Sequence, residues 1–264
     1  MKRRIDQLLV DRGFAESRQK AQALLLAGQV LVKNQKVEKA GQRVDADAEI
    51  RILRQLPFAS RAGAKLQAAL DHFKISVHGR TCADLGASTG GFTDCLLQNG
   101  AFRVYAFDVG KGQLAWRLRC DPRVVVRDAF NVRALNPVDL PEDVSFVSID
   151  LSFISVTKVL PPLKEALAIA PAAPGSQPPS AAVREADIVV LVKPQFEVGK
   201  GEVGKGGIVR EPDKRIRALE TIIEFARHES YHVVGSIPSP VAGAGGNQEF
   251  LLCLRLTKSL ISVR

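Results

Sequence analysis

The segment 81–93, TCADLGASTGGFT, constrains the fold of this chain more than any other part of its sequence. Its first five residues form a short, mostly apolar run, which predicts a strand buried on both faces of a sheet. Gly86, Gly90 and Gly91 then allow a tight loop whose backbone N–H groups can approach a ligand closely. We expect a helix to open from that loop at Phe92. A strand, a glycine loop and a helix form the first unit of a nucleotide-type site in an open α/β sheet, although a glycine loop alone is equally consistent with an ordinary turn.

An acidic residue farther along the chain favours the ligand-binding interpretation. Asp108 closes the next apolar run, 104–108, and lies 22 residues (108 − 86) after the first glycine of the loop. An acidic residue about 20 residues on, at the end of the second strand, suits the hydroxyls of a ribose. Ser88 stands where the dinucleotide pattern G-x-G-x-x-G has its second glycine, which a pyrophosphate needs for close backbone approach. We therefore favour S-adenosylmethionine, an adenosine that carries an amino acid, over NAD as the cofactor.

The first 56 residues form a separate and strongly basic unit. They hold 12 Lys and Arg against 7 Asp and Glu, a net charge of +5 out of +9 for the whole chain. Apolar spacing predicts helices near residues 5–12 and 18–27, then short strands between residues 30 and 52 with a turn at 33–36. This charge favours binding to RNA phosphates, and a solvated charged surface is the alternative. The candidate RNA-binding residues are Arg3, Arg4, Arg18, Lys20, Lys33 and Lys36.

A joint at residues 57–60 is expected to link this unit to a larger domain, 61–264. At 264 residues the chain has room for one medium domain and one small one. Pro57 restricts the residue before it to extended conformations, so that a helix should not run through the joint. We therefore predict a small N-terminal domain of residues 1–56, a short linker and one α/β domain.

Charged residues end several of the strands predicted for the larger domain. Apolar runs predict strands at 124–126, 144–150, 188–193, 231–237 and 250–256, and Pro212 suits the first turn of a helix that reaches about residue 228. Asp150 and Lys193 close two of these strands, at the edge where open α/β sheets bind their ligands. A lysine at the end of so apolar a run is costly unless a partner pairs with it. Asp128, just after the strand 124–126, is a candidate acceptor for an adenine amino group.

Other features narrow the class of protein. The four cysteines are scattered without metal-binding spacing, which predicts buried free thiols in a reducing cytoplasm. The four histidines have no nucleophile or metal partner at a useful spacing, which argues against a hydrolase or a metalloenzyme. No apolar run approaches the roughly 18 residues of a membrane span, and no signal peptide is expected. The Pro/Ala/Ser segment 171–182 should be a surface loop. The glycine-rich segment 199–207 should be a mobile flap, and phosphate binding is the alternative.

Several motifs together resemble the TlyA-type ribosomal RNA 2′-O-methyltransferases, a family also called haemolysin A. The unit 3–53 resembles an S-four RNA-binding domain. The other matching segments, in the family's order, are SR at 60–61 with KL at 65–66, DLGASTGGFT at 84–93, DLSFIS at 150–155, LVKPQFE at 191–197, GIVR at 207–210 and GNQEF at 246–250. The resemblance implies a Rossmann-like α/β methyltransferase of the FtsJ type, of class I, with helices on both faces of its sheet, behind a small α+β RNA-binding domain.

The resemblance also implies a set of functional residues. The family's catalytic Lys-Asp-Lys-Glu tetrad falls on Lys65, Asp150, Lys193 and Glu249. Together with the loop spacing, it places S-adenosylmethionine on Asp84, Gly86, Ser88, Gly90, Gly91, Phe92, Asp108, Val109 and Asp128. The implied substrate is a cytidine ribose in ribosomal RNA, in the cytoplasm, with no metal and no membrane involved. Two departures stand out: LPFA at 56–59 replaces the family's Arg-x-Trp-Val linker, and the segment 171–182 resembles an insertion.

The chemistry of methyl transfer explains a tetrad with two lysines. A ribose 2′-hydroxyl is a poor nucleophile at neutral pH and must lose its proton as it attacks a sulfonium methyl group. A neutral lysine amine can take that proton, and burial or a second nearby cation favours the neutral form of an amine. We assign the base to Lys193, which the sequence places deepest in the apolar sheet, and we expect Lys65 to steer the hydroxyl. The two carboxylates should hold the two ammonium groups in place.

Two other functions stay open at this point. A non-catalytic RNA-binding or ribosome-assembly factor could keep the same fold, and a lack of methyl transfer to any RNA would favour it. A membrane-active haemolysin is suggested by the family's second name. The sequence has no strongly amphipathic basic helix of the kind that lies on a membrane surface, which argues against direct pore formation.

Overall fold

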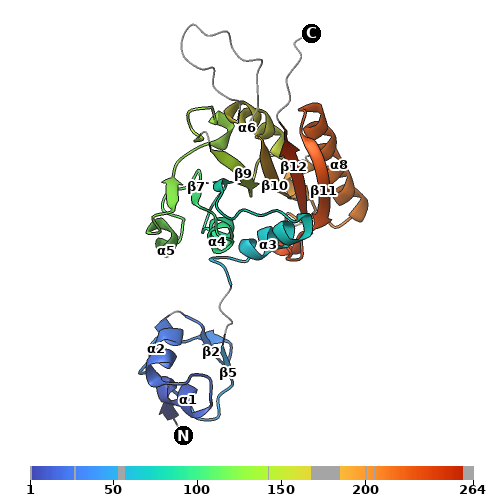
Figure 1. Ribbon diagram of the computed structural model, residues 1–264. Coiled ribbons are helices and arrows are strands. Elements are labelled where there is room, and N and C mark those ends of the chain that lie inside the picture. Colours follow the sequence, from blue (N-terminus) through green and yellow to red (C-terminus); the bar gives the residue numbers. More distant parts are fainter. Residues whose placement is uncertain are drawn as a thin grey trace, which may run out of the picture. The chain divides into compact units, whose positions relative to one another are not determined.

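The computed structural model describes residues 2–26, 28–52, 57–141, 143–167, 185–199, 201–204 and 206–257. The chain divides into two compact units, Met1–Leu56 and Pro57–Arg264, each of which has its own hydrophobic core. Figure 1 shows both units, coloured along the chain. The segment 171–182, which was predicted to be a surface loop, lies outside the described residues.

The N-terminal unit packs two short helices against two small sheets. Its elements are β1 (Lys2–Arg4), α1 (Ile5–Asp11), α2 (Arg18–Leu26), β2 (Val30–Val32), β3 (Gln35–Lys36), β4 (Arg43–Asp45) and β5 (Ile50–Ile52). Strand β1 pairs with β4, and β2 lies between β3 and β5, all antiparallel. Ile5 of α1 and Leu25 of α2 are fully buried in the core, as the helical spacing predicts. The turn predicted at 33–36 is shorter than expected, because Gln35 already pairs with Val32.

The C-terminal unit is built on one seven-stranded sheet. Its helices are α3 (Ala62–Phe73), α4 (Gly91–Gln98), α5 (Trp116–Arg119), α6 (Leu160–Ala166), α7 (Pro194–Glu197) and α8 (Pro212–His228). Its strands are β6 (Thr81–Leu85), β7 (Arg103–Phe107), β8 (Val124–Arg127), β9 (Val144–Ile149), β10 (Ala186–Val192), β11 (His232–Pro238) and β12 (Phe250–Leu256). The strand order is β11-β12-β10-β9-β6-β7-β8. Strand β12 runs antiparallel to both of its neighbours, and every other neighbouring pair is parallel.

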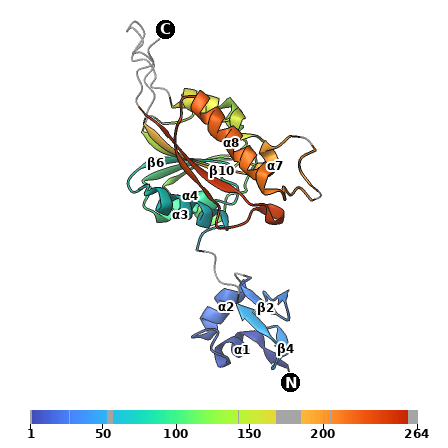
Figure 2. The ribbon, with the colours of Figure 1, turned by 90° about the vertical axis from the view of Figure 1, so that its right-hand side faces the viewer.

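Helices cover both faces of this sheet, which confirms the predicted fold class. Figure 2 shows α3 and α4 on one face and α8 on the other. The sequence of β10 is apolar throughout because both faces of this strand are buried, and alternate side chains of a strand point to opposite faces. Ile188 and Val190 belong to the core that contains residues of α6 and α8, whereas Val189 and Leu191 belong to the core that contains residues of α3 and α4.

The first residues of the C-terminal unit are fastened to α4. The carboxylate of Asp94 accepts a hydrogen bond from the N–H of Ala59 at 2.6 Å, and the amide of Gln98 donates to the carbonyl of Pro57 at 2.8 Å. Phe58 is buried against Gly63, where a Cβ would overlap the phenyl ring. The segment predicted as a linker is thus attached to this unit from its first residue.

All four cysteines carry free thiols, and their burial matches the prediction at three positions. Cys82, Cys95 and Cys253 are buried, and desolvation raises the pKa of Cys82 and of Cys95 to about 12. The prediction of a buried thiol is wrong for Cys120, which is exposed because it follows the short surface helix α5. In the described part of the chain, no helix is both long and apolar enough to cross a membrane.

Candidate active site

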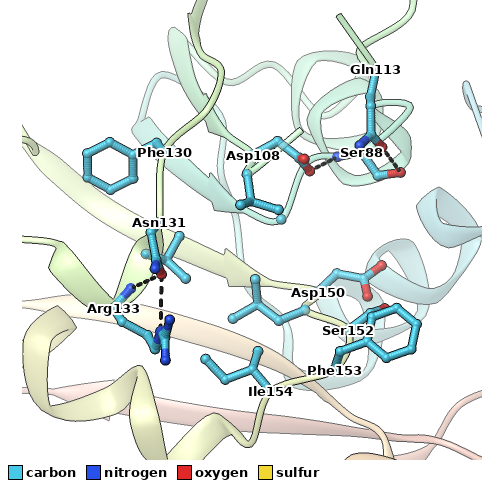
Figure 3. Close-up of a pocket in the computed structure, with 14 residues that line it drawn as sticks. Ser88, Asp108, Gln113, Phe130, Asn131, Arg133, Asp150, Ser152, Phe153 and Ile154 are labelled. Atoms are coloured by element: carbon cyan, nitrogen blue, oxygen red, sulfur yellow. Dashed lines mark hydrogen bonds between the residues drawn. The ribbon is translucent and has the colours of Figure 1, made fainter. Parts of the chain in front are cut away.

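The order of the strands reverses at β6, and a cavity lies there. The chain runs from β6 outward to β7 and β8 and then returns to place β9 on the other side of β6. Such a switch point leaves a crevice at the carboxyl ends of the strands. The cavity, shown in Figure 3, holds about 490 Å³, a usual size for a small-molecule site. Its walls follow β6 (Gly86 and Ser88), β7 (Asp108, Val109 and Gln113), β8 (130–133) and β9 (150–154).

The glycine loop after β6 forms the first wall. Gly86 has a φ of +93°, and a Cβ there would overlap the carbonyl oxygen of Asp150, so that only glycine fits. The N–H groups of Gly86 and Ala87 donate to the carbonyl of Phe107 at 2.9 and 3.0 Å. Ser88 also has a positive φ, +48°, which is costly for a residue with a side chain. The loop therefore keeps a glycine-like backbone conformation where serine replaces the second glycine.

Asp108, at the end of β7, presents a fixed carboxylate to the cavity. One of its oxygens accepts a hydrogen bond from the N–H of Ser88, and the other accepts one from the N–H of Gly110, both at 2.7 Å. A carboxylate oxygen can accept two hydrogen bonds, so each keeps capacity for a further donor. Ribose hydroxyls are donors of this kind. The neighbouring Val109 is exposed and lines the same wall.

Five of the nine residues predicted to bind the cofactor lie outside the cavity wall, namely Asp84, Gly90, Gly91, Phe92 and Asp128. Asp84 is 0% exposed, and its carboxylate accepts hydrogen bonds from the hydroxyls of Thr93 at 2.7 Å and Ser148 at 2.9 Å. Desolvation raises the pKa of Asp84 to about 6. Its position and bonds are those of a group that joins β6 to α4 and β9. The glycines and phenylalanine at the start of α4 pack against protein.

Asp128 points toward α5 instead of into the cavity. Its carboxylate accepts hydrogen bonds from Arg119 at 2.8 Å and from the N–H of Gly112 at 3.1 Å. Phe130, Asn131 and Arg133 form this part of the wall in its place, as Figure 3 shows. The side chain of Asn131 accepts from the N–H and the Nε of Arg133 at 3.1 and 3.3 Å. These three residues were not predicted, although they closely follow a strand whose carboxyl end was expected at the ligand edge.

The four residues of the predicted tetrad come from three strand ends and one helix. Asp150 follows β9 and Lys193 follows β10. Glu249 precedes β12, whose antiparallel pairing places its first residue opposite the last residue of β10. Lys65 lies in α3, a helix that contacts β12. All four side chains therefore start from the region of the sheet's carboxyl edge.

The first lysine–carboxylate pair stands beside the cavity. The Nζ of Lys193 lies 2.7 Å from the Oδ1 of Asp150 in an ion pair and donates a hydrogen bond to the Oγ of Ser152 at 3.0 Å. Asp150 and Ser152 both line the cavity. The ring of Phe196 lies 6.0 Å from the same Nζ, within the range of a cation–π contact.

The second pair is more deeply buried. The Nζ of Lys65 donates to the Oε2 of Glu249, and their side chains are only 9% and 2% exposed. The side chain of Lys193 is 12% exposed, so the prediction that this lysine lies deepest is wrong. The reason is that Lys65 lies on the buried side of α3, a helix that contacts the sheet at β12, whereas Lys193 stands at a strand end. The carboxylate of Glu249 fills the space beside Gly243, where a Cβ would overlap it.

An exposed aromatic ring stands at the mouth of the cavity. Phe153 is 92% exposed with a φ of +65°, and its ring centroid lies 5.1 Å from that of Phe196. The end of its loop is braced by Glu197, whose carboxylate accepts from the Oγ of Ser155 at 2.6 Å and the N–H of Val156 at 2.9 Å. Burial raises the pKa of Glu197. An exposed ring on a braced loop can stack against a nucleobase.

The loop that carries Glu249 is joined to the glycine-rich segment 199–207. The N–H of Val209 donates to the side-chain oxygen of Asn247 at 3.0 Å, and the amide of Asn247 donates to the carbonyl of Gly207 at 2.9 Å. Asn247 is itself buried. The end of the segment predicted as a mobile flap thus rests on the loop of the second lysine–carboxylate pair.

The cavity residues fit S-adenosylmethionine. Asp108 keeps acceptor capacity for ribose hydroxyls, and Gly86 leaves the strand end free of a side chain. Val109 and Phe130 supply apolar surface for a purine ring. In the part of the chain that the structure describes, no group of three or more His, Cys, Asp or Glu side chains could hold a metal ion.

Each of the six residues predicted to bind RNA in the N-terminal unit forms an ion pair. Arg4 and Arg18 both contact Asp6, and hydrogen bonding by Arg4 above all holds the pKa of that carboxyl well below its usual range. The other pairs are Arg3–Asp11, Lys20–Glu16, Lys33–Asp45 and Lys36–Glu38. Lys2 and Arg43, which were not predicted, form no ion pair with any described residue. They line a cavity of about 210 Å³ that also includes Lys33 and Lys36.

The fold and the cavity together define a class of enzyme. A seven-stranded, mostly parallel sheet with an adenosine-type site at its switch point is a Rossmann-like methyltransferase fold. The FtsJ-like methyltransferase family matches residues 58–256, and the S4 domain matches residues 3–50. The chain belongs to the FtsJ-like methyltransferase family, and S-adenosylmethionine is the cofactor of this family, as predicted.

Named relatives agree with this membership. The 16S/23S rRNA (cytidine-2′-O)-methyltransferase TlyA of Mycobacterium tuberculosis is 45% identical over 254 residues, which cover 96% of this chain and 89% of that protein. A solved structure from Streptococcus thermophilus, of a protein named as a hemolysin, is 41% identical with a TM-score of 0.70, and it covers 98% of this chain and 90% of that chain. A solved S-adenosylmethionine-dependent methyltransferase from Listeria monocytogenes shares the fold alone, at 14% identity and a TM-score of 0.52, over 75% of this chain and 99% of that one.

Proposed function

We propose that this protein transfers a methyl group from S-adenosylmethionine to the 2′-hydroxyl of a cytidine in ribosomal RNA, in the cytoplasm. The observation that carries the proposal is the ion pair between Lys193 and Asp150 beside the cofactor cavity. A hydroxyl nucleophile needs a base within reach, and this pair offers a lysine amine beside the place of reaction. The match to the S4 domain and the relative named for cytidine 2′-O-methylation support ribosomal RNA as the substrate.

The residues on the cavity side would position both reactants. When bound, S-adenosylmethionine supplies an electrophilic methyl group on a positively charged sulfur. Asp108 would accept hydrogen bonds from its ribose, and the loop at Gly86 would allow close approach of its amino-acid end. The exposed ring of Phe153 would stack on the base of the target nucleotide and so hold its ribose at the cavity mouth. Positioning of this kind can supply a large part of the rate, because the methyl donor already carries a good leaving group.

The first lysine pair would carry out the proton transfer. The Nζ of Lys193, as a neutral amine, would take the 2′-hydroxyl proton while the oxygen bonds to the methyl carbon and the bond from that carbon to sulfur breaks, so that S-adenosylhomocysteine would leave. Asp150, 2.7 Å away, would orient the amine and stabilise the ammonium that forms. Lys193 is favoured as the base because both of its partners, Asp150 and Ser152, line the cavity. The depth of burial does not favour Lys193, because Lys65 is buried more deeply. Lys65 would steer the hydroxyl, and Glu249 would hold the ammonium of Lys65 in place.

Two substitutions of Lys193 test the base directly. Lys193→Ala should lower kcat by about 10²–10⁴-fold with the affinities for cofactor and RNA near wild type. Lys193→Arg is the matched control, because a guanidinium can keep the pair with Asp150 but stays protonated in proteins. It should be as inactive as the alanine variant. An arginine variant within a few-fold of wild type would show that this position does not act as the base.

Mapping of 2′-O-methyl sites tests the substrate. Ribosomal RNA from cells with and without this protein should differ at a cytidine. Purified protein should restore that methyl group on isolated ribosomal subunits when S-adenosylmethionine is added. If RNA binds and no methyl group is transferred to any ribosomal RNA, the chain is an RNA-binding factor that keeps a methyltransferase fold.

A further inference from the structure

Trp116 is exposed in a way that calls for an explanation. It is the only tryptophan of the chain, and it is 78% exposed at the start of α5. A large aromatic side chain left in water forgoes the free energy that its burial would release. Leu114 and Leu118, two residues before and after it, are both buried. The segment therefore directs its leucines inward and its indole outward.

The segment that carries Trp116 is firmly attached. Leu114 and Leu118 pack against Gly90, where a Cβ would overlap both side chains. The N–H of the residue before Trp116 donates to a carbonyl of the glycine loop at 3.2 Å. Arg117 forms an ion pair with a buried carboxylate of α4. The indole cannot turn inward without breaking these contacts, so it forms a preorganised aromatic surface.

The loop 108–115, which leads into α5, also forms part of the cavity wall. Asp108 and Val109 line the cavity, and so does Gln113, three residues before Trp116. The Oγ of Ser88 lies 3.4 Å from the side-chain oxygen of Gln113 and donates to it. A strand of nucleic acid that places one nucleotide at the cavity mouth has its next nucleotides close by. Trp116 follows the cavity wall by only three residues of the chain.

The charge of the surrounding segment suits a nucleic acid. Residues 103–133 hold seven Lys and Arg against three Asp, a net charge of +4. Three of the cations, Arg117, Arg119 and Arg123, form ion pairs. The other four form none with any described residue, namely Arg103, Lys111, Arg127 and Arg133. Single-stranded RNA is bound by surfaces that combine cations for the phosphates with exposed aromatic rings for the bases.

We propose that Trp116 is a stacking platform for a nucleobase that flanks the nucleotide to be methylated. The inference rests on the proposed function for the direction of the RNA strand, because the strand must enter at the cavity mouth. Trp116 is a positioning residue in this proposal: it contacts RNA and takes no part in the proton transfer. Alanine at this position should therefore raise the KM for RNA and leave kcat nearly unchanged.

Fluorescence of the full-length chain tests the proposal, because its only tryptophan is the platform itself. Addition of a short oligocytidylate RNA should quench the emission and protect the indole from acrylamide. Inorganic polyphosphate is the matched control, since it engages the same cations but has no base to stack. Binding of the RNA, followed through a dye on the RNA, without any change in the tryptophan emission overturns the proposal. So does an indole that acrylamide cannot reach before RNA is added, because another part of the chain then covers it.

Three variants complete the test on ribosomal subunits. Trp116→Ala should weaken RNA affinity about tenfold, which corresponds to about 1.4 kcal/mol, whereas Trp116→Phe should keep most of it. Phe102→Ala is the control, because Phe102 is also exposed but precedes β7, at the sheet edge opposite the cavity. Equal affinities for the Trp116→Ala and Phe102→Ala variants overturn the proposal. If the wild type transfers no methyl group but its tryptophan is quenched by RNA, the proposed function fails and the RNA surface stands.

Discussion

Removing one side of the buried pair between Lys65 and Glu249 should destabilise the C-terminal unit severely. Lys65→Met leaves a carboxylate that is 2% exposed without its counter-charge, and breaking such a pair costs about 3–5 kcal/mol. Glu249→Met leaves an ammonium on a 9% exposed side chain, which costs less because a long lysine can reach toward water. The double variant replaces both charges with unbranched apolar chains of similar length, so we expect it within about 2 kcal/mol of wild type.

Urea unfolding followed by far-ultraviolet circular dichroism measures these differences. Most of the helical residues lie in the C-terminal unit, so the signal reports mainly on that unit, whereas the emission of the exposed Trp116 would change little. The expected order of stability is wild type, then the double variant, then Glu249→Met, then Lys65→Met, at similar urea dependence. A Lys65→Met variant within about 1 kcal/mol of wild type would refute the reasoning, because the carboxylate would then have found water or another partner. Loss of methyl transfer in a stable double variant would show that the pair also acts in the reaction.

Three further predictions follow from the site and from the N-terminal unit. Asp108→Ala should weaken S-adenosylmethionine binding by about 1–3 kcal/mol in calorimetry, and an unchanged affinity would remove this residue from the site. The pKa of Asp84 is about 6 in the folded protein and near 4 in the unfolded chain, so the folded state binds this proton more tightly. The free energy of unfolding should therefore fall by about 3 kcal/mol as pH rises from about 4 to 6. Asp84→Asn should abolish this pH dependence in unfolding experiments. Lys2→Ala and Arg43→Ala should each lower the salt dependence of RNA binding by about one counterion, more than the ion-paired Arg18→Ala does, and equal slopes would contradict this.

Local patterns in the sequence were sufficient to predict an open α/β sheet, and the family resemblance implied its methyltransferase type. Apolar runs of strand length, glycine at Gly86 and proline at Pro212 each act on their own few residues, and the structure places the elements where those residues predict them. The strand ends at Asp108 and Asp150 could be placed at the cavity for the same reason, because parallel strands share one carboxyl edge.

The remaining site residues could not be predicted because they depend on which way a side chain turns. Asp128 lies on the expected loop, yet Arg119 draws its carboxylate toward α5, and Phe130 and Asn131 face the cavity instead. The sequence predicted Lys193 to be deeper than Lys65 because it follows five apolar residues. The structure reverses this order, because Lys65 lies on the buried side of α3, whereas Lys193 stands at a strand end.

The antiparallel direction of β12 has a consequence for the order in which the protein can be completed during synthesis. Lys65 and Glu249 are 184 residues apart in sequence, and the carboxylate arrives immediately before the last described strand. Until the ribosome has made that strand, α3 carries a lysine with no partner and β10 lacks a neighbour on one side. Contacts so distant in sequence form late, because they close a long loop. A partly made chain is therefore expected to lack a settled active centre, and the enzyme would become competent only after β12 has left the ribosome.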